Sequence, residues 1–330
     1  VMKQLGLDVC DSGIILGEKL KRVGSTELSH LLSKNGVKLF ARTTPRQKLK
    51  IVESLKKNGE IVAMMGDGVN DAPALKRADI GIVVGEATDV AKESADLILL
   101  DSNFSTIVAA IEEGRGIFDN VRKIILYLMS DSFEEIVAVV GTIVLGLPLP
   151  VTAAQILWIN LVSDGLPDMA LTVDPKRQGI MKDQPRSPKE ALISKWMRWL
   201  ILLVSFSGGF VALVVYVYFY KTTGDLELAR SITFATLGIN SLFYVFSIRT
   251  LRQPFWQQNP FANRWLNVAV LAGTILQVLP FVSDTTRRFF DVVSLSFTHW
   301  MTIVCFALFM FIIIEVLKVP FRHKLHHSNI

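Results

Sequence analysis

The chain has 330 residues, 51% of them hydrophobic, and its 35 Lys and Arg against 30 Asp and Glu give a formal net charge of +5. A mean hydropathy of +0.41 is too high for an ordinary soluble domain and indicates a membrane protein. The basic residues sit mainly in links between apolar runs, where membrane topology explains them, so we expect no nucleic-acid partner. The two cysteines, Cys10 in the less apolar first third and Cys305 in an apolar run near the end, lie in different expected domains and match no metal or redox spacing, which excludes a disulfide framework.

The first third of the chain has the composition of a soluble domain. In chain order it predicts a helix over 44–59, a strand over 61–65, a loop over 66–73 leading into a short helix, a strand over 80–84, a helix over 87–95 and a strand over 97–100. Alternating helices and apolar strands are typical of a parallel sheet covered by helices. We therefore expect residues 1–117 to form part of a Rossmann-like α/β domain. A helical pattern is already in progress over residues 1–7, so we expect a fragment of a longer protein.

The remainder of the chain alternates long apolar runs with short polar links. A helical pattern without proline runs from residue 104 to Pro148 and becomes apolar in its second half. We predict a membrane domain over 118–330 with an α-helical bundle of six spans, at about 118–147, 153–171, 199–220, 232–248, 266–282 and 300–317. Lys and Arg concentrate in the links after the second, fourth and sixth spans. We therefore expect a multi-pass integral membrane protein with its soluble domain and C-terminus in the cytosol.

Two carboxylates and an amide lie on a turn after a predicted strand, in the run Gly66-Asp67-Gly68-Val69-Asn70-Asp71-Ala72-Pro73. Open α/β sheets bind ligands at this end of their strands, and Mg²⁺ prefers one or two carboxylates beside phosphate oxygens. We expect Asp67 to be the direct Mg²⁺ ligand, with Asn70 and Asp71 shaping the rest of the site. A plain surface turn that caps the next helix is the better interpretation of a generic Gly-Asp-Gly, but it does not account for eight specific residues.

This run is similar to the hinge motif of P-type ATPases, which are members of the haloacid-dehalogenase superfamily. The resemblance extends through residues 40–42 and 44–48, where Lys48 matches the phosphate-stabilising lysine of the family. It implies Mg²⁺ as cofactor, ATP as substrate, and a catalytic set of Lys48, Asp67, Asn70 and Asp71. The family's phosphorylated aspartate, in an Asp-Lys-Thr-Gly motif, has no counterpart in this sequence, and neither does its nucleotide-binding domain. We therefore expect this chain alone not to hydrolyse ATP.

Polar and acidic residues occur inside the first two predicted spans. They are Asp131, Ser132, Glu134 and Glu135 in the first, and Asn160, Ser163, Asp164 and Asp168 in the second. An ionisable group inside a span is costly unless it meets a partner, an ion or water, so a functional role is the default interpretation. For Asp131, Glu134 and Asp168, extension of the side chain toward the membrane surface is an equally good explanation.

The spacing of these residues predicts a cage of oxygen ligands. Asn160, Ser163 and Asp164 follow one another at i, i+3 and i+4 and so share a helix face, as Ser132 and Glu135 do at i and i+3. Carboxylate, amide and hydroxyl oxygens suit a hard cation better than Cu⁺ or Zn²⁺. The run 165–167, Gly-Leu-Pro, is expected to break the second span and to free backbone carbonyls beside the cage.

Residues 158–167 resemble the second of these spans in calcium pumps of the sarcoplasmic-reticulum type. The resemblance implies that Glu135, Asn160 and Asp164 bind the transported cation. At the remaining implied ligands this chain differs from those pumps. Ser163 stands where they have a threonine, Ser132 where they have an asparagine and Asn240 where they have a glutamate. These departures fall on one of the two calcium positions of those pumps. The sequence is therefore also compatible with a pump that moves one ion per cycle, or with a different cation.

We therefore expect the C-terminal part of an ATP-driven calcium pump, which couples aspartyl-phosphate formation to cation movement through this carboxylate and amide cage across the lipid bilayer. The alternatives are a pump for Na⁺, K⁺, H⁺ or Mg²⁺, a membrane-tethered phosphatase and a secondary cation transporter. The phosphatase leaves the acids in the spans unexplained, and the transporter leaves the Gly66–Pro73 motif unexplained.

Overall fold

The computed structural model describes residues 13–33, 39–101, 103, 105–186, 190–249, 253–257 and 259–327. The chain divides into two compact units, Val1–Ile111 and Glu112–Ile330. The helix expected over residues 1–7 and Cys10 lie outside the described residues. The domain boundary expected at residue 117 stays a prediction.

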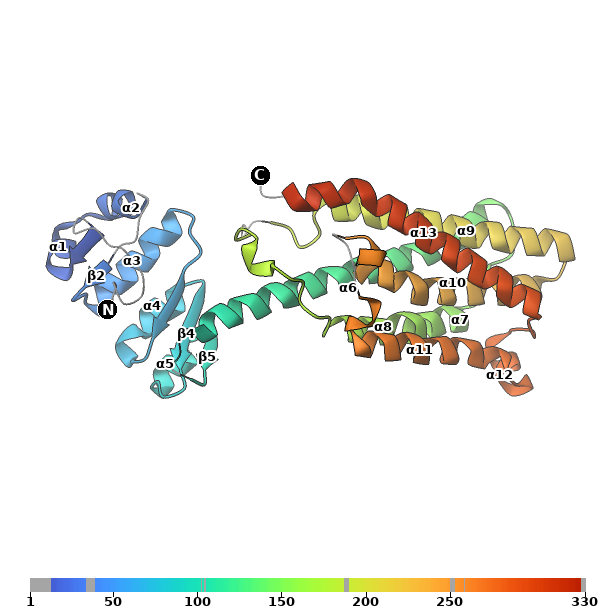
Figure 1. Cartoon of the computed structure of the whole chain (residues 1–330), viewed down its shortest axis with the longest axis horizontal. Coiled ribbons are helices and arrows are strands. Elements are labelled where there is room, and N and C mark those ends of the chain that lie inside the picture. Colours follow the sequence, from blue (N-terminus) through green and yellow to red (C-terminus); the bar gives the residue numbers. More distant parts are fainter. Residues whose placement is uncertain are drawn as a thin grey trace. The chain divides into compact units, whose positions relative to one another are not determined.

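Parallel strands form the centre of the first unit (Figure 1). Three of them, β3 (Ala63–Gly66), β4 (Ile80–Val84) and β5 (Leu97–Leu99), pair in that order in one sheet. A separate parallel pair consists of β1 (Ile14–Leu16) and β2 (Leu39–Ala41). The last three strands confirm the predicted parallel α/β character, with β3 displaced two residues along the chain from the predicted start. Neither β1 nor β2 was predicted, because three residues are too short to show a period.

Five helices accompany these strands: α1 (Gly17–Arg22), α2 (Ser25–Ser33), α3 (Pro45–Lys57), α4 (Ala72–Arg77) and α5 (Asp89–Glu93). The helix predicted over 44–59 is confirmed as α3, which starts after a capping box formed by Thr44 and Gln47. It ends before Gly59, whose positive φ of 86° suits glycine. The side chain of Asp79 joins α3 to the sheet, since it accepts a hydrogen bond from the Val62 N–H and pairs with Lys56. These contacts, the hydrogen bond first, lower the pKa of Asp79.

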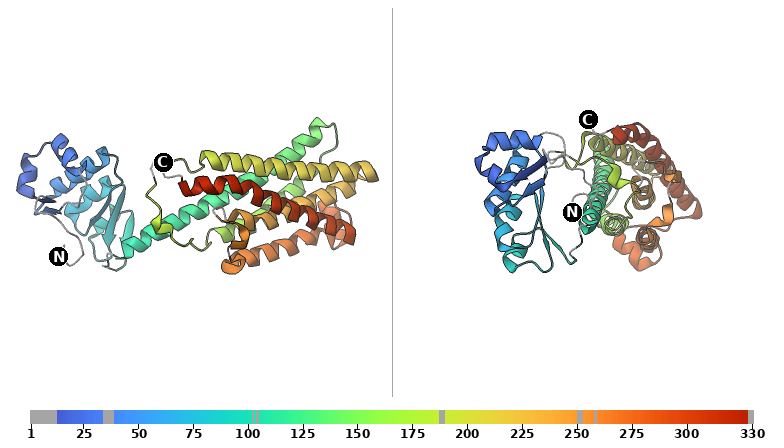
Figure 2. Two further views of the ribbon diagram at one scale, coloured as in Figure 1. Left: turned by 45° about the horizontal axis from the view of Figure 1, so that its top comes forward. Right: turned by 60° about the vertical axis from the view of Figure 1, so that its left-hand side comes forward.

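The second unit is mostly helical (Figures 1 and 2). Its elements are most of α6 (Ser105–Val144), α7 (Ala153–Trp158), the π-helical segment Ile159–Asp164, α8 (Gly165–Leu171), α9 (Lys195–Thr223), α10 (Leu226–Arg249), α11 (Arg264–Val278), the unpredicted α12 (Asp284–Phe290) and α13 (Phe297–His327). Helix α10 is the central one, because it packs against α9, α11, α13 and the π-helical segment. The polar side chains of α10 from Ser231 to Arg249 are therefore buried.

In the part of the chain that the structure describes, four helices are long and apolar enough to cross a membrane: Lys195–Thr223, Leu226–Arg249, Arg264–Phe281 and Phe297–Pro320. They overlap the last four predicted spans. The first two predicted spans differ for reasons visible in their sequences. The apolar half of α6 contains Asp131, Glu134 and Glu135, and residues 153–171 are divided between α7, the π-helical segment and α8.

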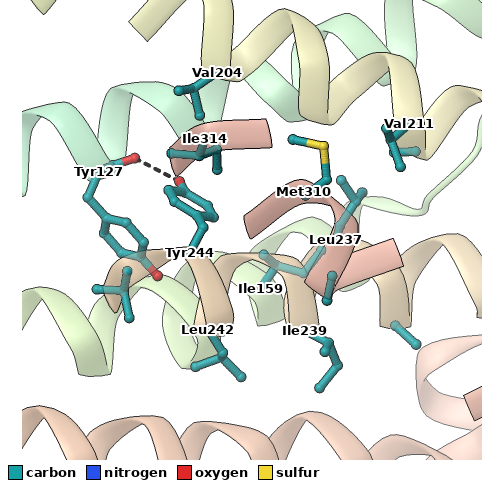
Figure 3. Close-up of a cluster of buried hydrophobic side chains, with 14 of the residues drawn as sticks. Tyr127, Ile159, Val204, Val211, Leu237, Ile239, Leu242, Tyr244, Met310 and Ile314 are labelled. Atoms are coloured by element: carbon teal, nitrogen blue, oxygen red, sulfur yellow. Dashed lines mark hydrogen bonds between the residues drawn. The ribbon is translucent and has the colours of Figure 1, made fainter. Parts of the chain in front are cut away.

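The core of the second unit consists of aliphatic and aromatic side chains from α6, α9, α10, α13 and the π-helical segment (Figure 3). Two fully buried tyrosines lie within it, Tyr127 of α6 and Tyr244 of α10, with ring centroids 5.2 Å apart. The Tyr244 hydroxyl donates a hydrogen bond to the Tyr127 carbonyl at 3.2 Å. Because a buried hydroxyl needs a partner, this bond aligns α6 with α10 at the level of the acids described below.

Candidate functional site

The loop over residues 66–73 follows β3 and leads through the short turn Val69–Asp71 into α4. The Asp71 carboxylate is buried, and it accepts a hydrogen bond from the Lys48 Nζ at 2.7 Å. Asp67 and Asn70 are exposed on the same loop. The structure thus brings Lys48 from α3 to the loop that follows β3, where it pairs with the Asp71 carboxylate.

Gly66 leaves room for Asp71, because a Cβ at this position would lie 2.6 Å from the Asp71 Cβ and 2.9 Å from its Oδ2. We expect Gly66→Ala to displace Asp71 from Lys48 and to lower the free energy of unfolding of this unit by about 1–3 kcal/mol, the usual cost of an overpacked site. Denaturant unfolding of purified protein measures the change. The matched control is Gly68→Ala, since a Cβ on Gly68 meets nothing within 4 Å. Equal effects of the two variants would contradict the packing argument.

A second cluster of polar groups is buried in the helical unit, around the Ser241 hydroxyl of α10. The Ser241 Oγ lies 2.6 Å from the Asp131 Oδ2, 2.6 Å from the Asp164 Oδ1 and 2.7 Å from the Tyr127 hydroxyl. All four side chains are at most 4% exposed. Carboxylates from α6 and from the π-helical segment therefore meet at one hydroxyl of the central helix.

The Ser241 hydroxyl has a single proton, so it donates to only one of the two carboxylates. The oxygen of the other carboxylate lies at the same distance from the Ser241 Oγ but receives no proton from it. This second carboxylate must therefore carry a proton of its own or bind a cation. Burying a carboxylate without such compensation costs several kcal/mol. This cluster is therefore suited to bind a proton or a cation.

Two further acids on α6 are buried and are contacted by amide side chains. Glu134 Oε1 accepts a hydrogen bond from the Asn240 Nδ2 at 2.8 Å, and Glu135 Oε2 lies 3.4 Å from the Asn160 Nδ2. The Asn160 amide also donates to the Ile156 carbonyl at 2.9 Å. The second carboxylate oxygen of Glu135 is buried with no hydrogen-bond partner. Each carboxylate thus has an amide contact at one oxygen and a second oxygen without a hydrogen-bond donor among the described residues.

The second span departs from α-helical geometry over Ile159–Asp164, a π-helical segment just before the predicted break at 165–167, and that run itself begins α8. The Gly165 N–H bonds to the Asn160 carbonyl five residues earlier, which widens the helix at Asp164. Pro167 has no N–H to offer the Ser163 carbonyl, and the Tyr127 hydroxyl donates to that carbonyl instead, at 2.9 Å. Asp164 thus contacts α10 from the end of the π-helical segment, and the Ser163 carbonyl keeps a partner on α6.

Family comparisons agree with both regions. Two models described as haloacid dehalogenase-like hydrolase match residues 12–79 and 48–111. A model described as the C-terminus of cation-transporting ATPases matches residues 148–319, which is more than half of the chain. The chain belongs to the P-type cation-transporting ATPases. Its long apolar helices are those of an integral membrane protein of this family.

Several curated P-type ATPases are similar over most of this chain. It is 40% identical over 306 residues to a calcium-transporting ATPase of Bacillus subtilis, which covers 92% of this chain and 34% of the relative. It is 35% identical over 340 residues to calcium-transporting ATPase 1 of Bacillus cereus, with 96% and 37% covered. A probable cation-transporting ATPase F of Mycobacterium tuberculosis is 37% identical over 270 residues, with 82% and 30% covered. The chain spans about a third of the length of the curated relatives it matches.

The structure pairs two of the predicted cation ligands of this P-type ATPase directly and places the others in separate contacts. Glu135 contacts Asn160, and Asp164 reaches the Ser241 cluster. The fully buried Ser163 directs its hydroxyl toward the Gln277 Oε1 on α11, at 3.4 Å. Ser132 is not brought to the cluster, because it lies on the exposed face of α6, one residue beyond Asp131. Its role as a ligand stays a prediction without support from the geometry.

Other polar residues enter the site that sequence reasoning left open or missed. Asp131 and Glu134 are 4% and 2% exposed, so they are buried and do not extend to the membrane surface. Ser241 and Tyr127 gave no signal, since hydroxyls are common inside membrane helices. Among the described residues, no three acidic, histidine or cysteine side chains converge closely enough to hold a metal ion by themselves. A cation here would need amide, hydroxyl or backbone oxygens in addition to carboxylates.

Proposed function

We propose that this chain is the C-terminal part of an ATP-driven pump that moves a hard cation, Ca²⁺ in the first place, through the buried acids of its helical unit. The observation that carries the proposal is the meeting of Asp131 and Asp164 at Ser241, in a chain that also has the Lys48–Asp71 pair of a phosphate site. Two of the similar proteins are named as calcium-transporting ATPases. Na⁺, K⁺, H⁺ and Mg²⁺ are the alternative cargoes.

The loop after β3 fits Mg²⁺ as the cofactor of phosphoryl transfer. Lys48 balances the charge of Asp71, and no described residue donates to the exposed Asp67 carboxylate, so Asp67 would hold the ion. Bound Mg²⁺ would offset the charge of the phosphate oxygens. Lys48 adds a fixed positive charge at the same strand end. The aspartate that accepts the phosphoryl group from ATP, and the nucleotide-binding domain, would belong to another part of the pump.

All six predicted spans would cross the membrane, with residues 118–147 and 153–171 carrying the acids between the more apolar helices. The soluble unit and the C-terminus would face the cytosol, as the Lys and Arg of the links indicate. Helix α6 has 40 residues without an internal break and carries Asp131, Glu134 and Glu135. Rigid movement of its soluble end would therefore change the geometry of these acids.

The test is acyl-phosphate formation from ATP by the pump that contains this chain. We expect cation-dependent phosphorylation in the wild type and a loss of at least about a hundredfold in Asp67→Asn, since the Mg²⁺ ligand loses its charge. Asp89→Asn, which alters an exposed acid at the start of α5, is the matched control. Cation flux without an acyl-phosphate would favour a secondary transporter. Phosphate-ester hydrolysis without cation dependence would favour a tethered phosphatase.

A further inference from the structure

A glutamine on α11 is fully buried inside the helical unit. The Gln277 side chain is 0% exposed, although most of the helix around it is apolar. Its Oε1 lies 3.4 Å from the Ser163 Oγ of the π-helical segment, and its Nε2 donates to the Phe234 carbonyl of α10 at 3.3 Å. Burying an amide is costly unless both its donor and its acceptor find partners. The Gln277 amide therefore joins α11 to two elements that carry predicted cation ligands.

The orientation of this amide is set by its partner on α10. A backbone carbonyl only accepts hydrogen bonds, so the Phe234 carbonyl requires the amide nitrogen of Gln277 on its side. The amide oxygen is then turned to Ser163, and in that contact the proton must come from the Ser163 hydroxyl. Gln277 thus determines where the proton of this hydroxyl lies.

Two glycines leave the space for this arrangement. A Cβ at Gly238 of α10 would lie 2.3 Å from the Gln277 Nε2, so the amide packs directly on the α10 backbone. One turn before Gln277, a Cβ at Gly273 of α11 would lie 3.3 Å from the Val162 carbonyl oxygen. Helix α11 therefore packs closely against the π-helical segment, and the amide has little freedom to turn away from Ser163.

The direction of its proton decides what the Ser163 hydroxyl can bind. A hydroxyl has one proton and two lone pairs, and it binds a cation through a lone pair. Because the proton points at the Gln277 Oε1, the lone pairs of Ser163 stay available beside Asn160 and Asp164 of the same segment. Groups that orient the ligands of a metal in this way are typically worth 10–100-fold in its affinity.

We propose that Gln277 is a positioning residue for the transported cation, which acts by holding the proton of the Ser163 hydroxyl away from the ion. This inference rests on the proposed function, because it requires a cation at Asn160, Ser163 and Asp164. Gln277 contributes no ligand oxygen of its own, since its Oε1 is occupied by Ser163. Helix α11, which contains no acidic residue, thereby contributes to the affinity for the cation.

The test is the cation concentration that gives half-maximal acyl-phosphate formation from ATP by the whole pump in lipid, with Ca²⁺ as the first probe. Gln277→Met keeps the length of the side chain and removes both hydrogen-bonding groups. We expect about a tenfold higher half-maximal concentration with an unchanged maximal level of acyl-phosphate. Gly238→Ala displaces the amide without removing it, and the same shift is expected. The matched control is Thr274→Val on α11, whose hydroxyl donates to the Val270 carbonyl of its own helix and whose loss should change nothing.

A double-mutant cycle distinguishes positioning from a general role in helix packing. If Gln277 acts through the Ser163 hydroxyl, Gln277→Met shifts the half-maximal concentration in the wild type but causes no further shift in Ser163→Ala. Unfolding temperatures in detergent show that each variant is folded.

A wild-type half-maximal concentration in folded Gln277→Met, or an equal shift in the presence and absence of the Ser163 hydroxyl, overturns the positioning role while the pump assignment stands. A wild type that forms no acyl-phosphate in response to Ca²⁺, Na⁺ or K⁺ overturns the proposed function and the positioning role with it.

Discussion

Asp164→Asn is expected to lower the affinity of the pump for its transported cation about a hundredfold or more, since even groups behind a metal ligand are worth 10–100-fold. Asp164 is 2% exposed and shares the Ser241 hydroxyl with Asp131. The amide has nearly the same shape as the carboxylate, so the change removes charge and one ligand oxygen while the packing is preserved. The cation dependence of ATPase activity in lipid measures the effect.

Thr172→Val, eight residues later, is the matched control for Asp164→Asn. The Thr172 hydroxyl is exposed and bonds to the Met169 carbonyl one turn earlier, so its loss should leave the cation dependence unchanged. A wild-type cation affinity in Asp164→Asn would remove this residue from the site. Loss of activity at every cation concentration, with loss of folded protein, would instead assign Asp164 a structural role.

Asp174→Asn is expected to destabilise the helical unit by about 3–5 kcal/mol, the usual cost of removing one partner from a buried ion pair. The Asp174 carboxylate, 3% exposed as a side chain, lies 2.6 Å from the Lys123 Nζ of α6 and 2.6 Å from the Arg249 Nε of α10. The Asn263 amide at the start of α11 donates to the same carboxylate. A single charge thus ties together three helices, and its removal leaves Lys123 and Arg249 without compensation.

Thermal or denaturant unfolding in detergent measures this loss, with Lys176→Ala as the control. Lys176 pairs with Glu113 at 2.6 Å on the surface, where solvent screening leaves an ion pair little effect on stability. The double variant Asp174→Asn with Lys123→Met should recover part of the stability, because it removes one of the uncompensated charges. A single Asp174→Asn variant as stable as the control would contradict the role of this carboxylate.

Local signals were sufficient to predict much of the fold. Helix α3 lies within the predicted range 44–59, between the capping box at Thr44 and the positive φ of Gly59, and the apolar β-branched run at Ile80–Val84 is a strand of the predicted length. Strands β1 and β2 escaped prediction, since each is three residues long and is recognised only through its pairing with the other. Pairing between distant segments carries no local period.

In the helical unit, the sequence was sufficient to identify the acidic site residues, but it did not identify the residues that contact them. Burial of charge within an apolar run marks a functional residue, which singled out Glu135 and Asp164. Helical spacing also placed Ser132 with Glu135, but α6 turns its other face, with Asp131 and Glu134, toward α10. The contact of Ser241 with both carboxylates could be recognised only from the central position of α10 in the structure. Because serine is common in membrane helices, the role of Ser241 follows from helix packing and not from its residue type.

In the proposed pump, the binding of a cation at the buried acids controls phosphorylation. The most direct measurement is acyl-phosphate formation from ATP by the whole pump in lipid, titrated separately with Ca²⁺, Na⁺, K⁺ and protons, with Asp164→Asn beside the wild type. We expect phosphorylation that rises with micromolar Ca²⁺ in the wild type and is lost at that concentration in the variant. Phosphorylation that is independent of every cation, or equal in the two proteins, would contradict it.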